Sequence, residues 1–479
     1  MSTYDAIVVG SGPNGLAAAI TFAQAGLSVA LFEAKETIGG GLRSAALTLP
    51  GFIHDVCSAV HPLGIASPFF RQLPLEQHGL EWIHPLAPLA HPLDDGTAIL
   101  LERSIDLTSQ QLGTDQLAYQ RLMDPFVANW DKLAEDILAP LHFPRHPILL
   151  GRFGLLGVRS AQHLAMHVFE SQRARALFTG LAAHSIMPLD WPLTAAFGLT
   201  LGSLGHVVGW PIPRGGSQSI ANALVSIFRL LGGEIFTHHN VEDLTDLPSA
   251  RVILLDVTPR QLLKIVKNRF PARYRQKLEK YRYGPGIFKV DWALHQPIPW
   301  KAKECSLAGT IHLGGTLQEI AQSEREVWEG KHSERPFILM AQQSLFDESR
   351  APETKHTAWG YCHVPNGSSV DMTKQIEDQI ERFAPGFKDC ILERSTRSAI
   401  QLERYNPNCV GGDINGGVQD LYQFLRRPVS WFHPYSTPIQ GLYLCSSSTP
   451  PGGGVHGMCG YHAARIALKD CFKYLSISR

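Results

Sequence analysis

The strongest structural constraint in the chain is the segment Gly10-Ser11-Gly12-Pro13-Asn14-Gly15, which has the pattern G-x-G-x-x-G. Residues 5–9, just before it, are mostly apolar and end in β-branched side chains, as in a buried parallel strand. Residues 16–25 are rich in Ala and Leu and predict a helix, and residues 28–32 predict a second strand. Together they form a β-α-β unit of about 30 residues, the size of a dinucleotide-binding half.

Each glycine of this turn has a physical reason. Gly10 permits the tight turn, Gly12 lets a pyrophosphate approach the backbone, and Gly15 lets the helix pack closely on the strand. Free N–H groups at the helix start then face the phosphates. Glu33 ends the second strand, where a carboxylate can accept hydrogen bonds from ribose hydroxyls. The predicted cofactor contacts of this unit are Gly10, Gly12, Pro13, Asn14, Gly15, Glu33 and Ala34.

A second glycine-rich turn, Gly39-Gly40-Gly41-Leu42-Arg43-Ser44, follows soon after Glu33. The G-x-G-x-x-G pattern is shared by NAD and FAD sites, so it does not choose between them. A second turn lets the chain pass close to another part of a long cofactor, which favours FAD. We therefore expect Gly40, Gly41, Leu42 and Arg43 to contact the cofactor, with Arg43 at the pyrophosphate or the flavin edge.

The C-terminal part of the chain has a comparable pattern. Residues 441–445 predict a strand, 446–454 a glycine-rich loop, and 455–468 a helix. The start of such a helix presents backbone N–H groups, which stabilise negative charge on a bound group.

These segments resemble a known superfamily. Residues 33–44 resemble the E-x(5)-G-G-x-x-R-S block of FAD-dependent amine oxidases and phytoene desaturases, and residues 441–460 resemble the flavin-binding motif of the phytoene desaturase-like branch. Residues 54–63, 213–216, 283–286 and 406–413 also resemble this branch, and in particular bacterial proteins related to the pyridine nucleotide-disulphide oxidoreductase domain-containing proteins. The resemblance implies FAD as cofactor, a backbone contact of Val241 with adenine, and flavin contacts at Gly454, Val455, His456, Gly457 and Met458.

Three side chains are candidate catalytic groups. Lys289 lies in a segment similar to the amine oxidase strand whose lysine holds a water at the flavin, and His61 and His456 lie in the cofactor-side motifs. Imidazole titrates near neutral pH and suits a general acid or base. A structural role for each of the three remains an alternative, since flavin chemistry needs no catalytic side chain.

Composition excludes other classes. Lys plus Arg (43) equals Asp plus Glu (43), so no positive field favours nucleic acid. The eight Cys form no C-x-x-C and no metal-like spacing, and no metal is expected. Residues 1–9 contain no basic region or cleavage site, which predicts a cytoplasmic protein. Residues 191–213 carry no Asp, Glu, Lys or Arg but contain glycines and prolines, so we expect a buried helix or tunnel wall, with peripheral membrane contact as an alternative.

The fold prediction is α/β, with a discontinuous Rossmann-like FAD-binding domain (1–70, 211–290 and 405–479) and an α+β substrate domain (71–210 and 291–404). The leading function is an FAD-dependent oxidoreductase that dehydrogenates, desaturates or isomerises an apolar, polyene-, isoprenoid- or lipid-like small molecule. The alternatives are an O2-using oxidase of an amine or other polar substrate, and a flavin-binding interaction protein without turnover. The sequence does not determine the oligomeric state.

Overall fold

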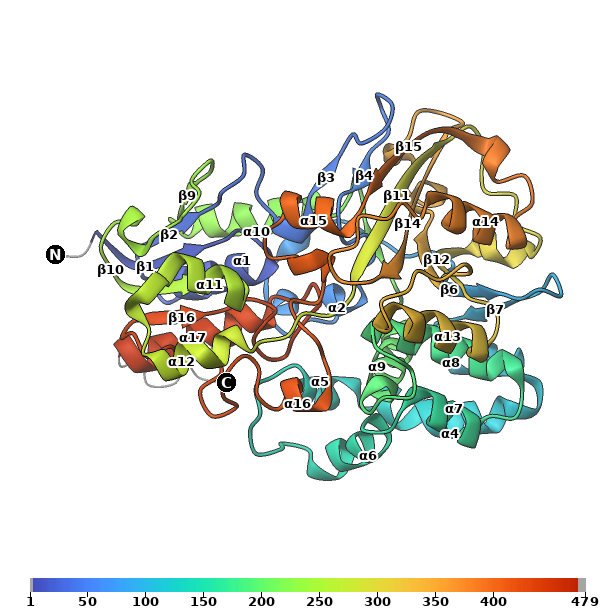
Figure 1. Cartoon of the computed structure of the whole chain (residues 1–479), viewed down its shortest axis with the longest axis horizontal. Helices are drawn as coiled ribbons and strands as arrows, with labels where there is room; N and C mark the ends of the chain where they lie inside the picture. The colour runs from blue at the N-terminus through green and yellow to red at the C-terminus, as the bar shows by residue number, and fades with distance from the viewer. Residues whose placement is uncertain (1–2, 473–479) are drawn as a thin grey trace.

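The computed structural model describes residues 3–472. Its N-terminal β-α-β unit is built as predicted, from β1 (Tyr4–Val9), α1 (Pro13–Gln24) and β2 (Val29–Phe32). These strands belong to a five-stranded parallel sheet of order β16-β10-β1-β2-β9, completed by β9 (Glu234–Phe236), β10 (Ala250–Leu255) and β16 (Leu442–Leu444). Segments far apart in the chain therefore form one Rossmann-type sheet (Figure 1).

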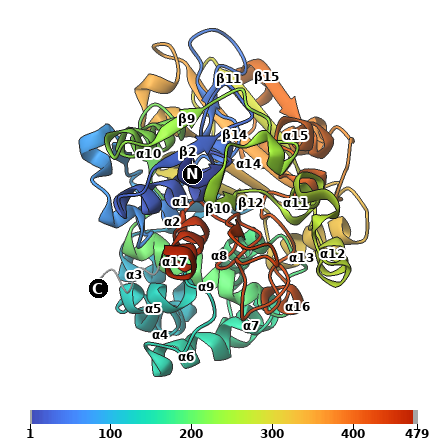
Figure 2. The ribbon, with the colours of Figure 1, turned by 90° about the vertical axis from the view of Figure 1, so that its left-hand side faces the viewer.

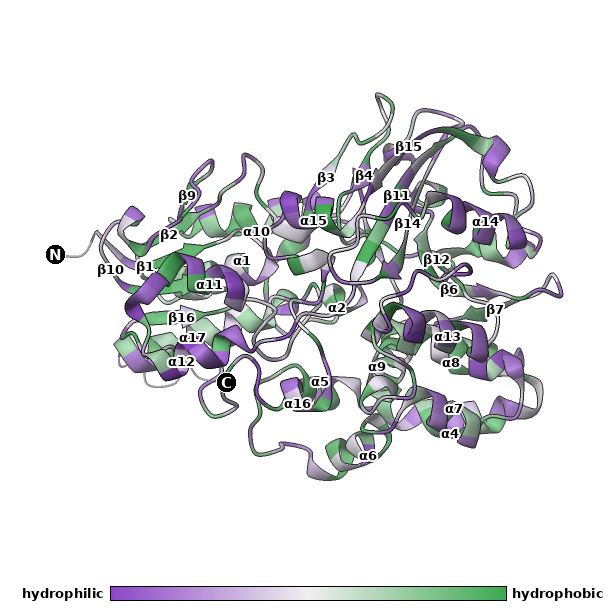
Figure 3. Cartoon of the chain, viewed as in Figure 1, coloured by the Kyte–Doolittle hydropathy of each residue, from purple (hydrophilic) through white to green (hydrophobic). Residues whose placement is uncertain are grey.

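Side chains that alternate along the strands of this sheet pack into two different hydrophobic cores, one on each face. Ala6 and Val8 pack in the core that holds α1, α10 (Gln218–Leu230) and α17 (Met458–Phe472). Ile7 and Val9 face the opposite side, where α11 (Pro259–Val266) and α12 (Ala272–Glu279) lie. Helices thus cover both faces, as the continuous apolar strands require, and β1 and β16 are coloured hydrophobic in Figure 3.

A seven-stranded mixed sheet forms the other half of the molecule, to the right in Figure 1. Its order is β15 (Ile391–Arg397), β11 (Gly286–Leu294), β14 (His356–Val364), β13 (Ile338–Ala341), β12 (Ala308–Leu313), β6 (Ala87–Pro92) and β7 (Ala98–Leu101). All neighbours are antiparallel except β12 and β6. One face packs on α14 (Thr373–Phe383) through a separate apolar core.

A helical segment lies below both sheets in Figures 1 and 2. It contains α4 (Gln116–Val127), α5 (Trp130–Ile137), α6 (Pro147–Gly157), α7 (Ala161–Val168), α8 (Gln172–Ala182) and α9 (Thr194–Val207). The uncharged stretch 191–213 contains α9, which is mostly buried, in agreement with the expected buried helix. Within residues 3–472, no helix combines the length and apolar character needed to cross a membrane.

The predicted fold class, a Rossmann-type α/β unit combined with a second α+β unit, is confirmed by these two sheets. One predicted boundary differs from the strand pairing. Residues 286–290 were expected in the FAD-binding domain, but β11 is hydrogen-bonded between β14 and β15 in the seven-stranded sheet. The alternating pattern predicted this strand correctly, but local sequence does not indicate which sheet a strand joins.

A candidate dinucleotide site and its adjoining cavity

The two glycine turns pack against each other at the carboxyl ends of β1 and β2. Gly10 has a positive φ of 101°, and a Cβ at Gly15 would lie 1.9 Å from the Gly10 carbonyl oxygen. A Cβ at Gly40 would lie 2.9 Å from Gly12 Cα. These positions therefore exclude side chains, as expected for turns whose backbone a pyrophosphate approaches closely.

Helix α1 begins at this turn. Its N-cap residue is Gly12, which has no side chain to cap the first N–H groups of the helix. Among residues 3–472, no acceptor bonds the backbone N–H of Gly12 or of Asn14. The Asn14 side chain is buried, and its Oδ1 has no hydrogen-bond partner among residues 3–472. Unpaired N–H groups at a helix start form an anion site, and they fit the phosphates of a dinucleotide.

Glu33 ends β2 as predicted, and its buried carboxylate organises both turns. It accepts hydrogen bonds from the N–H groups of Ser11 (3.0 Å) and Lys35 (2.9 Å). It also pairs with Arg43 at 3.0 Å, while Arg43 Nε donates to the Thr37 carbonyl at 2.7 Å. Arg43 is thereby held between the acid and the second turn.

Asp256, at the end of β10, is a site residue that the sequence analysis missed. Its Oδ2 accepts a 2.9 Å hydrogen bond from the Gly15 N–H and would lie 2.9 Å from a Cβ at Gly12. Burial, reinforced by the nearby Glu33 charge, raises the pKa of Asp256 to about 7. A carboxyl group that titrates near neutrality therefore lies beside the phosphate-binding turn.

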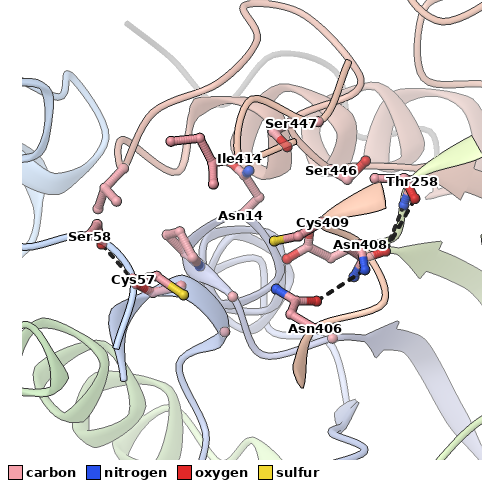
Figure 4. A pocket seen from close by; sticks show the side chains of 18 of the residues that line it. Asn14, Cys57, Ser58, Thr258, Asn406, Asn408, Cys409, Ile414, Ser446 and Ser447 are labelled. Carbon is pink, nitrogen blue, oxygen red and sulfur yellow. Dashed lines mark hydrogen bonds between the residues drawn. The ribbon is translucent and has the colours of Figure 1, made fainter. Parts of the chain in front are cut away.

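A cavity of about 880 Å³ begins at these turns and reaches the seven-stranded sheet. Its first part, which we call the cradle, is lined by residues 10–14, 33–35, 40–41 and 256–258. Asn406, Asn408 and Cys409 face this part from another segment, with Ser446 and Ser447 beside them (Figure 4). Asn408 is fixed there, because its Oδ1 accepts a 2.9 Å hydrogen bond from the Thr258 N–H.

The other part, which we call the sheet end, is aromatic and aliphatic. It is lined by Ile287, Leu339, Trp359 and Tyr361 from the inner face of the seven-stranded sheet, and by His184 and Trp210 from the helical segment. No Asp, Glu, Lys or Arg from this sheet or the helical segment lines the cavity within the described residues. The cavity therefore joins a polar cradle to an uncharged end, and its volume lies in the range of small-molecule sites.

The C-terminal helix brings its preceding loop to the same cavity. Helix α17 crosses α1 so closely that a Cβ at Gly460 would lie 1.7 Å from the Asn14 carbonyl oxygen. Gly454 and Val455 line the cavity, whereas His456, Gly457 and Met458 do not. His456 Nδ1 accepts a 3.0 Å hydrogen bond from the Met458 N–H, and burial lowers the His456 pKa to about 4. This neutral imidazole holds the loop at the helix start.

His61 lines the cavity but is tied to its surroundings. The Ser217 hydroxyl donates to the Ser58 carbonyl (2.7 Å), so His61 Nε2, at 2.7 Å, donates to Ser217 Oγ. Its Nδ1 is buried without a partner among the described residues, and burial lowers the His61 pKa to about 4. Its environment favours the neutral ring at neutral pH, and a catalytic role stays a prediction.

Lys289 is buried on β11 and pairs with Asp291, two residues along the same strand. Its Nζ lies 5.8 Å from the centre of the Trp359 ring, which lines the cavity, but Lys289 itself does not line it. Burial lowers the pKa of Lys289. The lysine thus lies near the cavity but outside its lining.

The structure brings most of the predicted cofactor contacts to one cavity. Those that line it are Gly10, Gly12, Pro13, Asn14, Glu33, Ala34, Gly40, Gly41, Arg43, Val241, Gly454 and Val455. Gly15 and Leu42 lie behind this lining and pack the two turns. The contacts with a cofactor stay predictions for all of these residues.

Comparisons with known proteins agree with this geometry. A family model for an NAD(P)-binding Rossmann-like domain matches residues 8–73. The rat pyridine nucleotide-disulfide oxidoreductase domain-containing protein 2 is 26% identical, over 98% of this chain and 94% of its own length. The lycopene-forming phytoene desaturase of Pseudescherichia vulneris is 23% identical, over 96% of this chain and 98% of its own length.

A solved structure of a putrescine oxidase triple mutant shares the fold. It has a TM-score of 0.62 and 18% identity, over 98% of this chain and 99% of that one. The sequence likenesses extend over both halves of the molecule and are not confined to the Rossmann sheet. The chain is therefore similar over nearly its whole length to oxidoreductases that include the phytoene desaturases, and its N-terminal end matches a Rossmann-like dinucleotide-binding domain.

Proposed function

We propose that this protein binds FAD and uses it to dehydrogenate, desaturate or isomerise an apolar small molecule. The observation that carries the proposal is the single cavity of about 880 Å³ that joins the cradle to the uncharged sheet end. A cofactor held at the two glycine turns can extend towards a substrate bound against the seven-stranded sheet. When bound, flavin supplies the hydride-accepting chemistry.

The side chains of this protein then have binding and positioning roles. The turns at Gly12 and Gly40 accept the pyrophosphate, and Glu33 is placed for the ribose. The loop before α17 reaches the cavity at Gly454 and Val455, so the positive end of the α17 dipole would favour negative charge on the bound group. Trp359 and Leu339 provide apolar contact area and exclude water from the sheet end.

An amine oxidase function is the second candidate, favoured by the position of Lys289 near Trp359. An ammonium substrate needs a carboxylate or an aromatic cage to replace its hydration. No carboxylate from the seven-stranded sheet or the helical segment lines the cavity in the described part of the chain. The rings of Trp210, Trp359 and Tyr361 offer aromatic contact to an ammonium group, but with no carboxylate beside them in the described lining of the cavity the dehydrogenase proposal is the better supported. A flavin-binding protein without turnover is the remaining alternative.

The test is reduction of the FAD-loaded protein by dithionite, followed by readmission of air. Slow recovery of the oxidised flavin spectrum, together with faster recovery when a quinone is added, is the expected result for a dehydrogenase. Rapid recovery in air with release of peroxide would instead establish an oxidase. A flavin that neither air nor quinone reoxidises would support the binding protein without turnover.

We also propose that the segment around α6 rests on a lipid surface, from which an apolar substrate could enter. Phe143, Ile148 and Leu155 are 90%, 89% and 73% exposed, and Ile148 and Leu155 are seven residues apart on one face of α6. Arg145 and Arg152 lie among them and suit anionic headgroups, although Arg145 also pairs with Glu135 at 3.0 Å. Co-sedimentation with phosphatidylglycerol vesicles, lost in a Phe143→Ser/Ile148→Ser variant, is expected. Equal sedimentation of both proteins would contradict the proposal.

A further inference from the structure

The sheet end of the cavity carries two polar groups that are open to solvent and that the proposed cofactor site does not use. Thr310 Oγ1 and Trp359 Nε1 also belong to residues of its lining, but both atoms are sealed from solvent. Tyr361 and His184 both line the cavity, one from β14 and one from the segment that follows α8. Among residues 3–472, the Tyr361 hydroxyl and His184 Nδ1 make no hydrogen bond, and neither atom is sealed from solvent. They are therefore available to a molecule in the cavity.

The register of the sheet shows that these groups lie on either side of Leu339. His312 on β12 pairs with Leu339 on β13, and Leu339 pairs with Tyr361 on β14. Directly paired residues share a face, so the three side chains form one row, with about 10 Å between the outer two strands. His184 packs on His312, with ring centres 5.1 Å apart, and Leu339 forms the apolar floor between the two polar groups.

The hydrogen bonds around His184 determine where its proton lies. His184 Nε2 and His312 Nε2 are 3.0 Å apart, so one of them donates to the other. His312 Nδ1 is buried with no partner in the described part of the chain, and a buried N–H without an acceptor is costly. The proton of His312 is therefore placed on Nε2, where it donates to His184. A neutral His184 then carries its own proton on Nδ1, which faces the cavity.

Both groups are uncharged at neutral pH. Burial lowers the pKa of His184 to about 3, and the pKa of the Tyr361 hydroxyl is raised by burial and by the nearby Glu324. The ring of His184 is held edge-on against Trp210 at 5.5 Å, and the Trp210 indole donates to the Leu201 carbonyl. The sheet end thus offers two fixed neutral donors on apolar walls.

We propose that this end binds a carbonyl-type oxygen on an otherwise apolar, uncharged substrate, with Tyr361 Oη–H and His184 Nδ1–H as the donors. The inference rests on the proposed function, because it takes the sheet end as the substrate site. A plain hydrocarbon would leave both donors without an acceptor. A carboxylate or an amine would find no counter-charge among the described residues that line this end. The substrate class is therefore a ketone- or aldehyde-bearing lipid or isoprenoid rather than a pure hydrocarbon.

Ligand binding can be measured by quenching of tryptophan fluorescence, because Trp210 and Trp359 line the cavity. The probes are 2-octanone, octane and octylamine, which share one chain length. We expect 2-octanone to bind most tightly, and Tyr361→Phe to weaken it by about 3- to 10-fold while octane is unaffected, as expected for loss of one hydrogen bond. Tyr461→Phe is the matched control, because this tyrosine lies on α17 away from the cavity.

His184→Phe is the second variant, since it keeps a ring against Trp210 and removes the donor. It should also weaken 2-octanone selectively. Octane binding as tightly as 2-octanone, or equal weakening of both probes in Tyr361→Phe and His184→Phe, would overturn the inference. The measurement does not need flavin, so selective ketone binding by a protein that cannot take up FAD would overturn the proposed function alone.

Discussion

Asp256 Oδ2 accepts a 2.9 Å hydrogen bond from the backbone N–H of Gly15, so a carboxyl group already occupies part of the anion-binding end of α1. Asp256 therefore caps α1 from a distant part of the chain, because the first residues of the helix supply no side-chain cap of their own. A pyrophosphate bound at the same turn would lie near this carboxyl. The protonation state of Asp256 is therefore linked to dinucleotide binding.

We predict that FAD affinity falls as pH rises above neutrality. The pKa of Asp256 is raised to about 7 in the folded protein, and a nearby dianion raises it further, so binding takes up a proton. Isothermal titration of the FAD-free protein between pH 6 and 8.5 should show about a tenfold loss per pH unit at the upper end. Asp256→Asn should abolish this slope, and an unchanged slope in the variant would refute the linkage.

The same group predicts a pH-dependent difference in stability. A carboxyl whose folded pKa lies above its unfolded value contributes stability at low pH, and this contribution is lost as pH rises from about 4 to 7. As pH rises through this range, the free energy of unfolding of Asp256→Asn should therefore increase relative to that of the wild type. Urea unfolding of both FAD-free proteins at pH 5 and pH 8 measures the difference, and a constant difference would argue against a raised pKa.

Gly12→Val should abolish FAD binding. A branched side chain here meets Asp256 within 2.9 Å and occupies the space where the phosphates approach. Flavin content per protein, measured after denaturation, should fall to background. Gly151→Ala is the control, because a Cβ there meets nothing within 4 Å, and it should retain full flavin. A fully loaded Gly12→Val protein would show that this turn does not hold the cofactor.

Lys289→Met should destabilise the protein more than it alters flavin reoxidation. The change leaves Asp291 buried without its partner, which costs about 3–5 kcal/mol. Lys289→Met/Asp291→Asn should recover most of the free energy of unfolding, since no unpaired charge remains. Air reoxidation per bound flavin should stay within about twofold, because Lys289 does not line the cavity. A tenfold slower reoxidation would instead support the oxidase candidate.

Arg350→Met tests the buried ion pair that links the seven-stranded half to the second glycine turn. Arg350 bonds Asp55 at 2.7 Å, and Asp55 in turn accepts from Ser44 Oγ and from the Ser217 N–H, each at 2.7 Å. Although burial opposes it, the guanidinium holds the pKa of Asp55 below its usual value. Unfolding should become about 3–5 kcal/mol easier, whereas Arg229→Met on the exposed face of α10 should change it little. Similar stabilities for the two variants would show that Asp55 finds another partner.

Features formed by residues adjacent in sequence were predicted, whereas features formed by contacts between distant segments were not. The unit of β1, α1 and β2 was predictable because its strand, turn, helix and acid are adjacent in sequence. The order of the seven-stranded sheet was not, because β6 pairs with β12 more than 200 residues later.

The site shows the same contrast. The glycines and Glu33 carried a local motif, whereas His184 and Tyr361 become neighbours of one cavity only through strand register and helix packing. Asp256 could have been found. It directly follows a buried strand as Glu33 does, and carboxyl ends of parallel strands meet at one edge of a sheet.

The most direct test of the account is the absorbance spectrum of the purified protein after incubation with FAD and removal of the excess. Bound flavin at about one equivalent, with its bands lost on dithionite reduction, is the predicted result. A colourless protein that retains no FAD under these conditions would contradict the cofactor assignment and the function built on it.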